Sequence, residues 1–128
     1  MTMDMKERLI NAAREVRERA YAPYSNYRVG AAILSENGKI YVGCNFENAS
    51  FGAGSCAERV ALGTALAAGE RKFIAVACVG DGMITPCGIC RQALSEFGDV
   101  TIWCAGADED GEIREYKLSE LLPHAFDL

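Results

Sequence analysis

Residues 56–92 read CAERVALGTALAAGERKFIAVACVGDGMITPCGICRQ, and this stretch decides the fold. Its first part, rich in alanine and leucine and closed by a glycine, predicts a helix over residues 56–68. The uninterrupted apolar run that follows is typical of a strand buried on both faces, which we place at residues 72–80. Pro86 then marks the start of a second helix over residues 87–97. The stretch therefore predicts a helix–strand–helix unit whose strand lies inside a sheet.

The flanking sequence supplies the rest of the sheet and a further helix layer. A Glu-Asn-Gly turn at residues 36–38 predicts a hairpin between the first two strands. The further predicted elements are helices over residues 4–20 and 118–122 and strands over residues 29–35, 39–44, 100–104 and 112–116. The order α, β, β, α, β, α, β, β, α predicts a three-layer α/β/α sandwich with a five-stranded mixed sheet. A length of 128 residues fits one domain over residues 1–128.

Composition narrows the possible partners. The chain carries a net charge of −5, and half of its residues are hydrophobic. It lacks both an apolar run near the ~20 residues needed to span a bilayer and a signal-peptide start, so we expect a cytoplasmic protein without a membrane partner. A nucleic-acid binder normally shows a basic patch. Here the basic residues of the first helix alternate with acids, which predicts a solvated face and no nucleic-acid partner; they are Lys6, Arg8, Arg14, Arg17 and Arg19.

Six cysteines in a chain without signs of secretion point to metal binding or burial rather than disulfides. The pair Cys87 and Cys90 alone is compatible with a zinc site, a redox pair or a plain helix start. Cys56 lies about thirty residues earlier, also at a predicted helix start. Helix N-termini lower the pKa of thiols, and thiolates are the metal ligands. Two such starts at one sheet edge can converge, so the three cysteines predict a metal site.

Three cysteines fill three of zinc's four tetrahedral positions, and an open fourth position is typical of a catalytic site. Other fourth ligands are poor candidates. Cys78 and Cys104 fall in apolar strands and are expected in the core, while His124 lies in the tail and is expected to be exposed. Cys44, at the end of a strand, stays open as an alternative ligand.

Charged residues beside the cysteines fit hydrolytic chemistry. Glu58, two residues after Cys56, can take a proton from a zinc-bound water and return it to a leaving group. Three thiolates leave the site with an excess negative charge. Arg59 and Arg91 directly follow Glu58 and Cys90 and could donate hydrogen bonds to sulfur. We favour Arg59 for this role, while a surface role for Arg91 is left open.

The stretch Cys56-Ala57-Glu58-Arg59 together with residues 86–92 resembles the short, three-cysteine form of cytidine deaminase. Further segments resemble that family in the same order; they are residues 21–25, 29–32, 43–49 and 120–123. The resemblance covers nearly the whole chain. It implies one Zn²⁺ per chain on the three cysteines, and hydrolytic deamination of cytidine and deoxycytidine in pyrimidine salvage with Glu58 moving the protons.

The resemblance also implies a substrate site. Asn45 and Glu47 match a pair that hydrogen-bonds the ribose, and the Ala57 backbone N–H matches a contact to the pyrimidine. Tyr27 stands where the family usually has a phenylalanine that packs on the base. Phe126 matches a tail aromatic that reaches a neighbouring subunit's site, which implies a homotetramer with shared active sites.

Two positions depart from the family pattern, and several alternatives stay open. Phe51 stands where many relatives have tyrosine, and His124 occupies a position that is often glycine. The polar groups of Asn45 and Glu47 could instead cap loop backbone. The alternative substrates are other aminopyrimidine nucleosides such as blasticidin S. A closed structural zinc module would not need Glu58, and a thiol redox module would leave the third cysteine unexplained.

Overall fold

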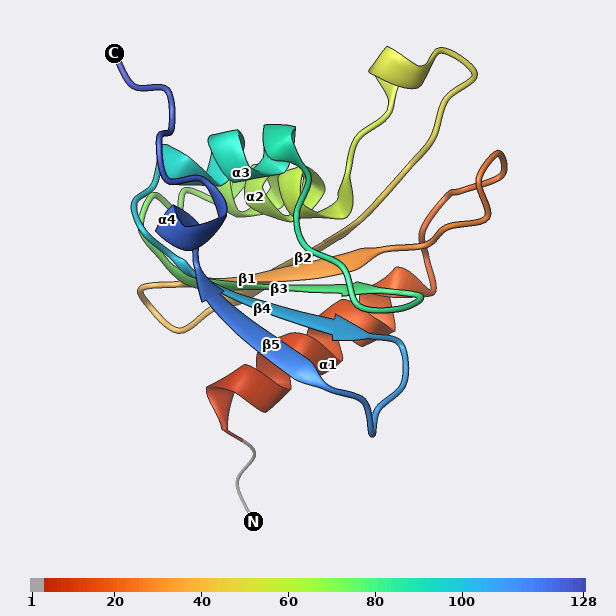
Figure 1. Ribbon diagram of the computed structural model, residues 1–128, viewed down its shortest axis with the longest axis horizontal. Coiled ribbons are helices and arrows are strands. Elements are labelled where there is room, and N and C mark those ends of the chain that lie inside the picture. Colours follow the sequence, from red (N-terminus) through yellow and green to blue (C-terminus); the bar gives the residue numbers. More distant parts are fainter. Residues whose placement is uncertain (1–3) are drawn as a thin grey trace.

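Five strands form one mixed sheet in the order β2-β1-β3-β4-β5 in the computed structural model, which describes residues 4–128 (Figure 1). Neighbouring strands are antiparallel except for β3 and β4, which run parallel. The strands are β1 (Gly30–Ser35), β2 (Ile40–Cys44), β3 (Phe73–Gly80), β4 (Thr101–Gly106) and β5 (Ile113–Lys117). The helices are α1 (Met5–Arg17), α2 (Ala57–Ala67), α3 (Gly88–Ser95) and α4 (Leu118–Leu121). The predicted order of elements is confirmed.

Helices cover both faces of the sheet, which confirms the three-layer α/β/α sandwich. Helix α1 lies on one face, and α2, α3 and α4 lie on the other (Figure 1). Each face has its own apolar cluster. Ala75, Ala77 and Val79 of β3 belong to the cluster under α1, whereas Val76 and Cys78 belong to the cluster under α2 and α3. The central strand is therefore buried on both faces, as its apolar run predicts.

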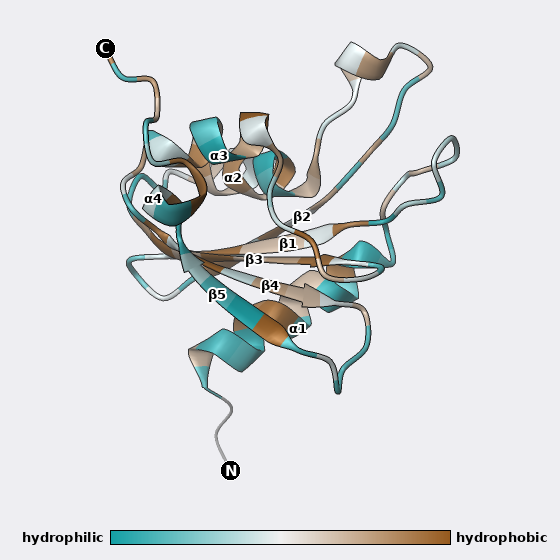
Figure 2. Cartoon of the chain, in the orientation of Figure 1, coloured by the Kyte–Doolittle hydropathy of each residue, from teal (hydrophilic) through white to brown (hydrophobic). Residues whose placement is uncertain are grey.

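Hydropathy falls toward the β5 edge of the sheet. Strands β1 and β3 are largely hydrophobic, whereas most of β5 is hydrophilic (Figure 2). The side chains of β5 are mostly exposed. The polar edge discourages strand pairing with another chain. Within residues 4–128, no helix is long and apolar enough to cross a membrane.

Two features near residues 18–53 differ from the prediction. Helix α1 ends at Arg17 instead of residue 20, because the chain turns away to bridge Tyr21 to Phe46. The backbone N–H of Tyr21 donates to the Asn45 carbonyl at 3.0 Å. A 3₁₀ turn, η1 (Phe51–Ala53), also lies between β2 and α2, where the sequence predicts neither a helix nor a strand.

The prediction that the basic residues of α1 form a solvated face is wrong for Arg17. This side chain is buried, and its Nε donates to the Arg28 carbonyl at 3.0 Å. The guanidinium also pairs with Asp81 and, at 3.4 Å, with Glu18. Arg17 thus joins α1 to two loops, one that follows α1 and one that follows β3. Periodicity alone does not separate a buried, paired arginine from a solvated one.

A close approach between α2 and β2 positions the start of α2. A Cβ built on Gly43 of β2 would stand 2.3 Å from the Ala61 nitrogen and 2.8 Å from the Ala57 carbonyl oxygen. Both contacts are backbone atoms of α2, which cannot move aside locally. The absence of a side chain at Gly43 therefore fixes the distance between helix and sheet.

We expect Gly43→Ala to destabilise the fold by about 1–3 kcal/mol, because the added methyl overpacks this contact. Gly63→Ala is the matched control, since a Cβ there meets no atom within 4 Å and the residue lies inside α2. The control should be neutral or stabilising by up to ~1 kcal/mol. Denaturant unfolding of both variants measures the difference, and equal stabilities would contradict this account of the packing.

Candidate active site

Three cysteine sulfurs converge at the starts of α2 and α3. The Sγ atoms of Cys56, Cys87 and Cys90 all lie within 4.8 Å of one another, and those of Cys56 and Cys87 are 3.7 Å apart. Thiolates on one tetrahedral zinc, with Zn–S bonds of ~2.3 Å, stand about 3.8 Å apart. The spacing and the chemistry of the donors therefore fit a zinc ion.

The other three cysteines within residues 4–128 lie outside this cluster. Cys78 and Cys104 are buried on paired strands, with their sulfurs 3.5 Å apart, which confirms that they are core residues. Cys44 ends β2 and is not part of the three-sulfur group. The cluster thus offers three protein ligands rather than four.

Two of the thiols belong to residues that directly precede the first helical residue, and this position sets their local electrostatics. Cys56 is the N-cap of α2 and Cys87 is the N-cap of α3, and neither side chain caps its helix by a hydrogen bond. The unpaired N–H groups at each start favour negative charge there. A hydrogen bond from the Cys90 thiol, helped by Arg59, lowers the pKa of Cys56 to about 5. The same pairing raises the pKa of Cys90.

The two arginines beside the cluster do different things. Hydrogen bonds to the sulfurs of Cys56 and Cys90 raise the pKa of Arg59. Arg91 instead donates from Nε to the Pro86 carbonyl at 2.7 Å, and to Leu121 and Thr85 from its other nitrogens. Arg59 is therefore the arginine that bonds the sulfurs, whereas Arg91 bonds two backbone carbonyls and the Thr85 hydroxyl.

Glu58 is a buried carboxyl in the first turn of α2. Only 4% of the residue is exposed, so it is not an ordinary surface glutamate. Burial raises the pKa of Glu58 to about 7, and the negative charge of Cys56 acts in the same direction. A carboxyl with a raised pKa beside three converging thiols suits proton transfer.

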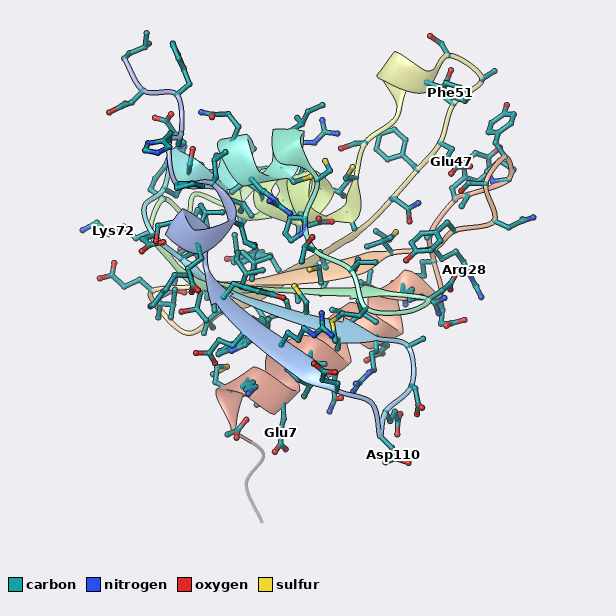
Figure 3. The ribbon with its side chains drawn as sticks, viewed as in Figure 1. Glu7, Arg28, Glu47, Phe51, Lys72 and Asp110 are labelled. Carbon is teal, nitrogen blue, oxygen red and sulfur yellow. The ribbon has the colours of Figure 1, made fainter. Side chains whose placement is uncertain are left out.

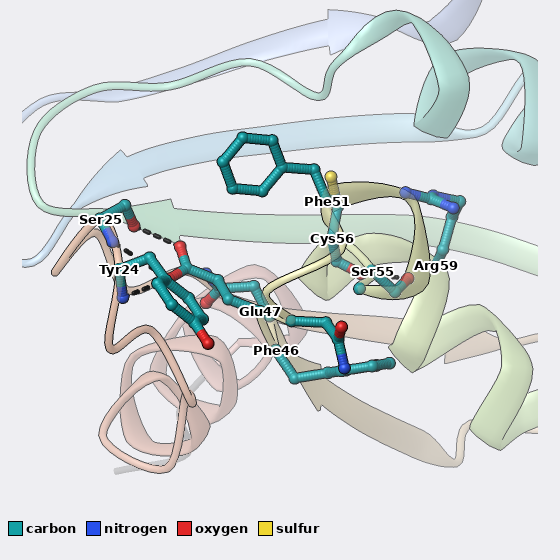
Figure 4. A pocket seen from close by; sticks show the side chains of 11 residues that line it. Tyr24, Ser25, Phe46, Glu47, Phe51, Ser55, Cys56 and Arg59 are labelled. Atoms are coloured by element: carbon teal, nitrogen blue, oxygen red, sulfur yellow. Dashed lines mark hydrogen bonds between the residues drawn. The ribbon is translucent and has the colours of Figure 1, made fainter.

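A cavity of about 290 Å³ opens onto the cluster and Glu58. Its size lies near the lower end of small-molecule sites. Its lining residues are Ser25, Tyr27, Val29, Asn45, Glu47, Cys56, Ala57, Glu58, Ile84, Thr85 and Cys87. A neighbouring cavity of about 380 Å³ shares four of them and is also lined by Phe46, Phe51 and Arg59 (Figure 4). The structure therefore brings Cys56, Cys87, Glu58 and four of the five predicted substrate residues to one hollow, with Cys90 in the sulfur cluster behind its lining.

Glu47 and Asn45 line this cavity and also hydrogen-bond the backbone of the loop after α1. The Glu47 carboxylate accepts hydrogen bonds from the backbone N–H of Tyr24 at 2.9 Å, and from both the N–H and the hydroxyl of Ser25 (Figure 4). The contact with the Ser25 hydroxyl is the main cause that lowers the pKa of Glu47. Figure 3 shows Glu47 on the segment that faces the loop after α1.

Asn45 is bonded in the same way. Its Oδ1 accepts from the Val29 N–H at 2.8 Å, and its Nδ2 donates to the Tyr27 carbonyl at 2.9 Å. Backbone capping by these two side chains, which the sequence left open, is thus present in the structure. The bonds described do not use the full hydrogen-bonding capacity of the amide or of the carboxylate, and both residues line the cavity.

The three aromatic residues singled out in the sequence lie in different surroundings. Tyr27 lines the cavity beside Ile84, and a Cβ on Gly80 would stand 2.7 Å from its hydroxyl. The missing side chain at Gly80 therefore makes room for the hydroxyl. Phe51 lies at the tip of the 45–55 segment and is 88% exposed (Figure 3). Phe126 is 70% exposed on the C-terminal tail, which lies at the opposite end of the molecule from that segment (Figure 1). It is not among the lining residues of its own chain's cavities.

Four lining residues were missed from the sequence: Ser25, Val29, Ile84 and Thr85. Ser25 belongs to a segment that matches the family, which is a usable signal. Ile84 and Thr85 lie in an irregular loop, where neither periodicity nor residue type indicates a cavity wall.

The fold and the site, with three converging thiols beside a buried carboxyl, are compatible with a zinc-binding hydrolase built on an α/β/α sandwich. Residues 3–105 match the family of the cytidine and deoxycytidylate deaminase zinc-binding region. The cytidine deaminase of Sporosarcina psychrophila is 44% identical over 94% of this chain and 90% of its own length, and that of Halalkalibacterium halodurans is 43% identical over 94% and 93%. The chain belongs to the cytidine and deoxycytidylate deaminase family.

Solved structures agree with this assignment. The crystal structure of cytidine deaminase from Burkholderia pseudomallei shares 48% identity, covers 97% of this chain and 100% of its own, and superposes with a TM-score of 0.89. Cytidine deaminase from Mycobacterium tuberculosis shares 35% identity over 98% of this chain and all of its own, with a TM-score of 0.83. The resemblance and the expected fold are confirmed.

We expect Cys56→Ser to lose most of its bound zinc in dialysis against a chelator, because a hydroxyl does not replace the thiolate that zinc prefers. Cys44→Ser is the matched control, since Cys44 lies outside the cluster. Elemental analysis after dialysis gives the metal content of each variant. Equal zinc retention in the two variants would contradict the assignment of the ligands.

Proposed function

We propose that this chain catalyses the hydrolytic deamination of cytidine and deoxycytidine to uridine and deoxyuridine with release of ammonia, as one domain over residues 1–128. The observation that carries the proposal is the buried Glu58 carboxyl beside three converging thiols in a cavity of ligand size. Relatives that are cytidine deaminases at 43–44% identity support this substrate over blasticidin S. A pyrimidine salvage role follows from the products.

Cys56, Cys87 and Cys90 would hold one Zn²⁺ per chain. When bound, zinc supplies a Lewis acid that lowers the pKa of a coordinated water toward ~7. Three thiolates outweigh the +2 charge of the ion. Arg59 offsets part of this excess through its hydrogen bonds to two of the sulfurs. Free thiols also suit a reducing compartment, which supports a cytoplasmic location.

Glu58 would carry the protons. Water adds to carbon 4 of the pyrimidine, and Glu58 takes a proton from that water and delivers it to ring nitrogen 3. Glu58 then moves the second proton to the amino group, the carbon–nitrogen bond breaks, and ammonia leaves. The sum is cytidine plus water giving uridine plus ammonia. Burial suits Glu58 to this shuttle, since its carboxyl lies in a pocket of low polarity.

The remaining cavity residues would hold the nucleoside. The unpaired N–H of Ala57, the first residue of α2, suits a contact to the pyrimidine. Tyr27 would pack on the base, and Asn45 and Glu47 would bond the ribose hydroxyls with the capacity that they keep beyond the loop backbone. Because the loop bonds already orient Asn45 and Glu47, little ordering remains for substrate binding.

Glu58→Gln tests the proposed chemistry. We expect the variant to keep its fold and its zinc and to lose at least ~10²-fold in kcat, since general acid–base groups typically contribute ~10²–10⁴-fold. The measurement is loss of cytidine absorbance, with uridine and ammonia quantified as products.

Glu120→Gln is the control for an exposed glutamate, because Glu120 lies in α4 and outside the cavity lining. It should retain wild-type turnover. Absence of cytidine turnover by the zinc-loaded wild-type protein would overturn the proposed function. A Glu58→Gln rate above a tenth of wild type would overturn the role of Glu58.

Glu47→Gln should lower kcat/KM for cytidine by about 10–100-fold, because a hydrogen bond to a charged group contributes ~1.5–3 kcal/mol. On 2′,3′-dideoxycytidine, which lacks the hydroxyls, the loss should be severalfold at most. Ser25→Ala removes a loop contact of Glu47 and is the control; its effect should be similar on both substrates. Equal losses of Glu47→Gln on both nucleosides would show that Glu47 acts through the loop alone.

The exposed Phe126 supports a homotetramer with shared active sites, in which this ring closes a neighbour's cavity. Glu58→Ala and Phe126→Ala chains refolded together should then recover activity. A chain with the Phe126 lesion keeps its own Glu58 and receives an intact Phe126 from its neighbour. The recovery is measured against each variant refolded alone. Mixed oligomers that stay inactive, although Phe126→Ala alone is impaired, would show that Phe126 acts within its own chain.

A further inference from the structure

The C-terminal tail is attached to α3 by one side-chain amide. Gln92 Nε2 donates to the Phe126 carbonyl at 3.0 Å, and the Phe126 N–H donates to Gln92 Oε1 at 3.1 Å. The two hydrogen bonds close a ring between one side chain and one residue's backbone, as in a pair of neighbouring strands. Both polar ends of the glutamine are used on the same residue, which fixes the position and the direction of the tail backbone at Phe126.

The rest of the tail offers little other attachment. Within residues 4–128, the hydrogen bonds that join residues 123–128 to the rest of the chain are the two between Gln92 and Phe126. The ring of Phe126 meanwhile is 70% exposed. The Phe126 backbone is thus held in place while most of its apolar ring stays exposed, which suits a contact with a partner surface.

Helix α3 connects this attachment to the thiol cluster. Cys90 belongs to the cluster, Arg91 bonds the Pro86 and Leu121 carbonyls, and Gln92 holds Phe126. Three successive residues of α3 thus connect the three-thiol cluster, the loop before α3 and the C-terminal segment. Because Cys90 joins α3 to the thiol cluster, α3 is a fixed element to which Gln92 can attach the C-terminal tail.

We propose that Gln92 is a positioning residue that holds the backbone at Phe126 so that its ring is presented to the cavity of a second copy of this chain. The inference rests on the proposed function, in which that ring completes a neighbour's site. Without the amide, the tail would sample many conformations, and the ring would have to be ordered at each binding event.

The test is a double-mutant cycle of Gln92→Met and Phe126→Ala on the zinc-loaded protein. Methionine keeps the length of the side chain and removes both hydrogen bonds. We expect Gln92→Met to raise KM for cytidine about tenfold with a smaller change in kcat, because the ordering cost of one freed residue is of that size. The double variant should be no worse than Phe126→Ala alone, since Gln92 acts through Phe126.

Amide hydrogen exchange gives a readout that does not depend on turnover. The Phe126 N–H should be protected in the wild type, and Gln92→Met should speed its exchange at least about tenfold. Gln92→Glu, which keeps the acceptor for this N–H and loses the donor to the carbonyl, is the second variant should methionine disturb α3. Zinc content and the unfolding midpoint check that α3 is intact.

Independent, additive losses in the cycle would overturn the inference, as would an unchanged KM in Gln92→Met or an unaffected Phe126→Ala. Unchanged protection of the Phe126 amide would overturn it as well. A wild-type protein that does not turn over cytidine would instead sink the proposed function. In that case the exchange measurement alone decides whether Gln92 holds the tail.

Discussion

The convergence of two helix starts beside the central strand is the constraint on which the site depends. Cys56 and Cys87 are N-cap residues, so their sulfurs are placed by the packing of α2 and α3 on the sheet. The close approach at Gly43 sets the position of α2, and β3 leads into the loop before α3. The 3.7 Å between the two sulfurs therefore follows from the packing of the two helices on the sheet. Such preorganisation lowers the cost of metal binding.

Polar side chains around the cavity hydrogen-bond the loop backbone, and the proposed function gives two of them a substrate contact as well. Glu47 and Asn45 cap the loop after α1, while buried Arg17 ties that loop to α1 and to Asp81 of the next loop. These bonds satisfy backbone groups that would otherwise be unpaired near an apolar hollow. They also hold the loop that carries Tyr27. The proposed substrate contacts of Asn45 and Glu47 would therefore be coupled to the order of this loop.

Much of the fold was predictable from the sequence because its signals are local. The apolar run of β3, the alanine-rich α2 and the Asn-Gly turn each fix an element independently of the rest. The three-cysteine cluster was predictable because ligand spacing and helix starts coincide. The family resemblance strengthened the assignment and supplied the proposed substrate contacts.

The remainder depends on tertiary contacts that no local pattern encodes. Arg17 lies on the buried face of α1, four residues after Ala13, but its charge predicts exposure; its partners come from the loop after α1 and the loop after β3. Ile84 and Thr85 line the cavity through the path of an irregular loop. The backbone bonds of Asn45 and Glu47 follow from the loop that folds over them, and the contact of Gln92 with Phe126 spans 34 residues.

X-ray absorption at the zinc edge measures whether the three thiolates form an open metal centre. We expect three sulfur neighbours at ~2.3 Å and one oxygen or nitrogen neighbour at about 2.0–2.2 Å in the substrate-free protein. A shell of four sulfurs would mean that a further cysteine closes the site, and the protein would then hold a structural zinc. That result would contradict the account.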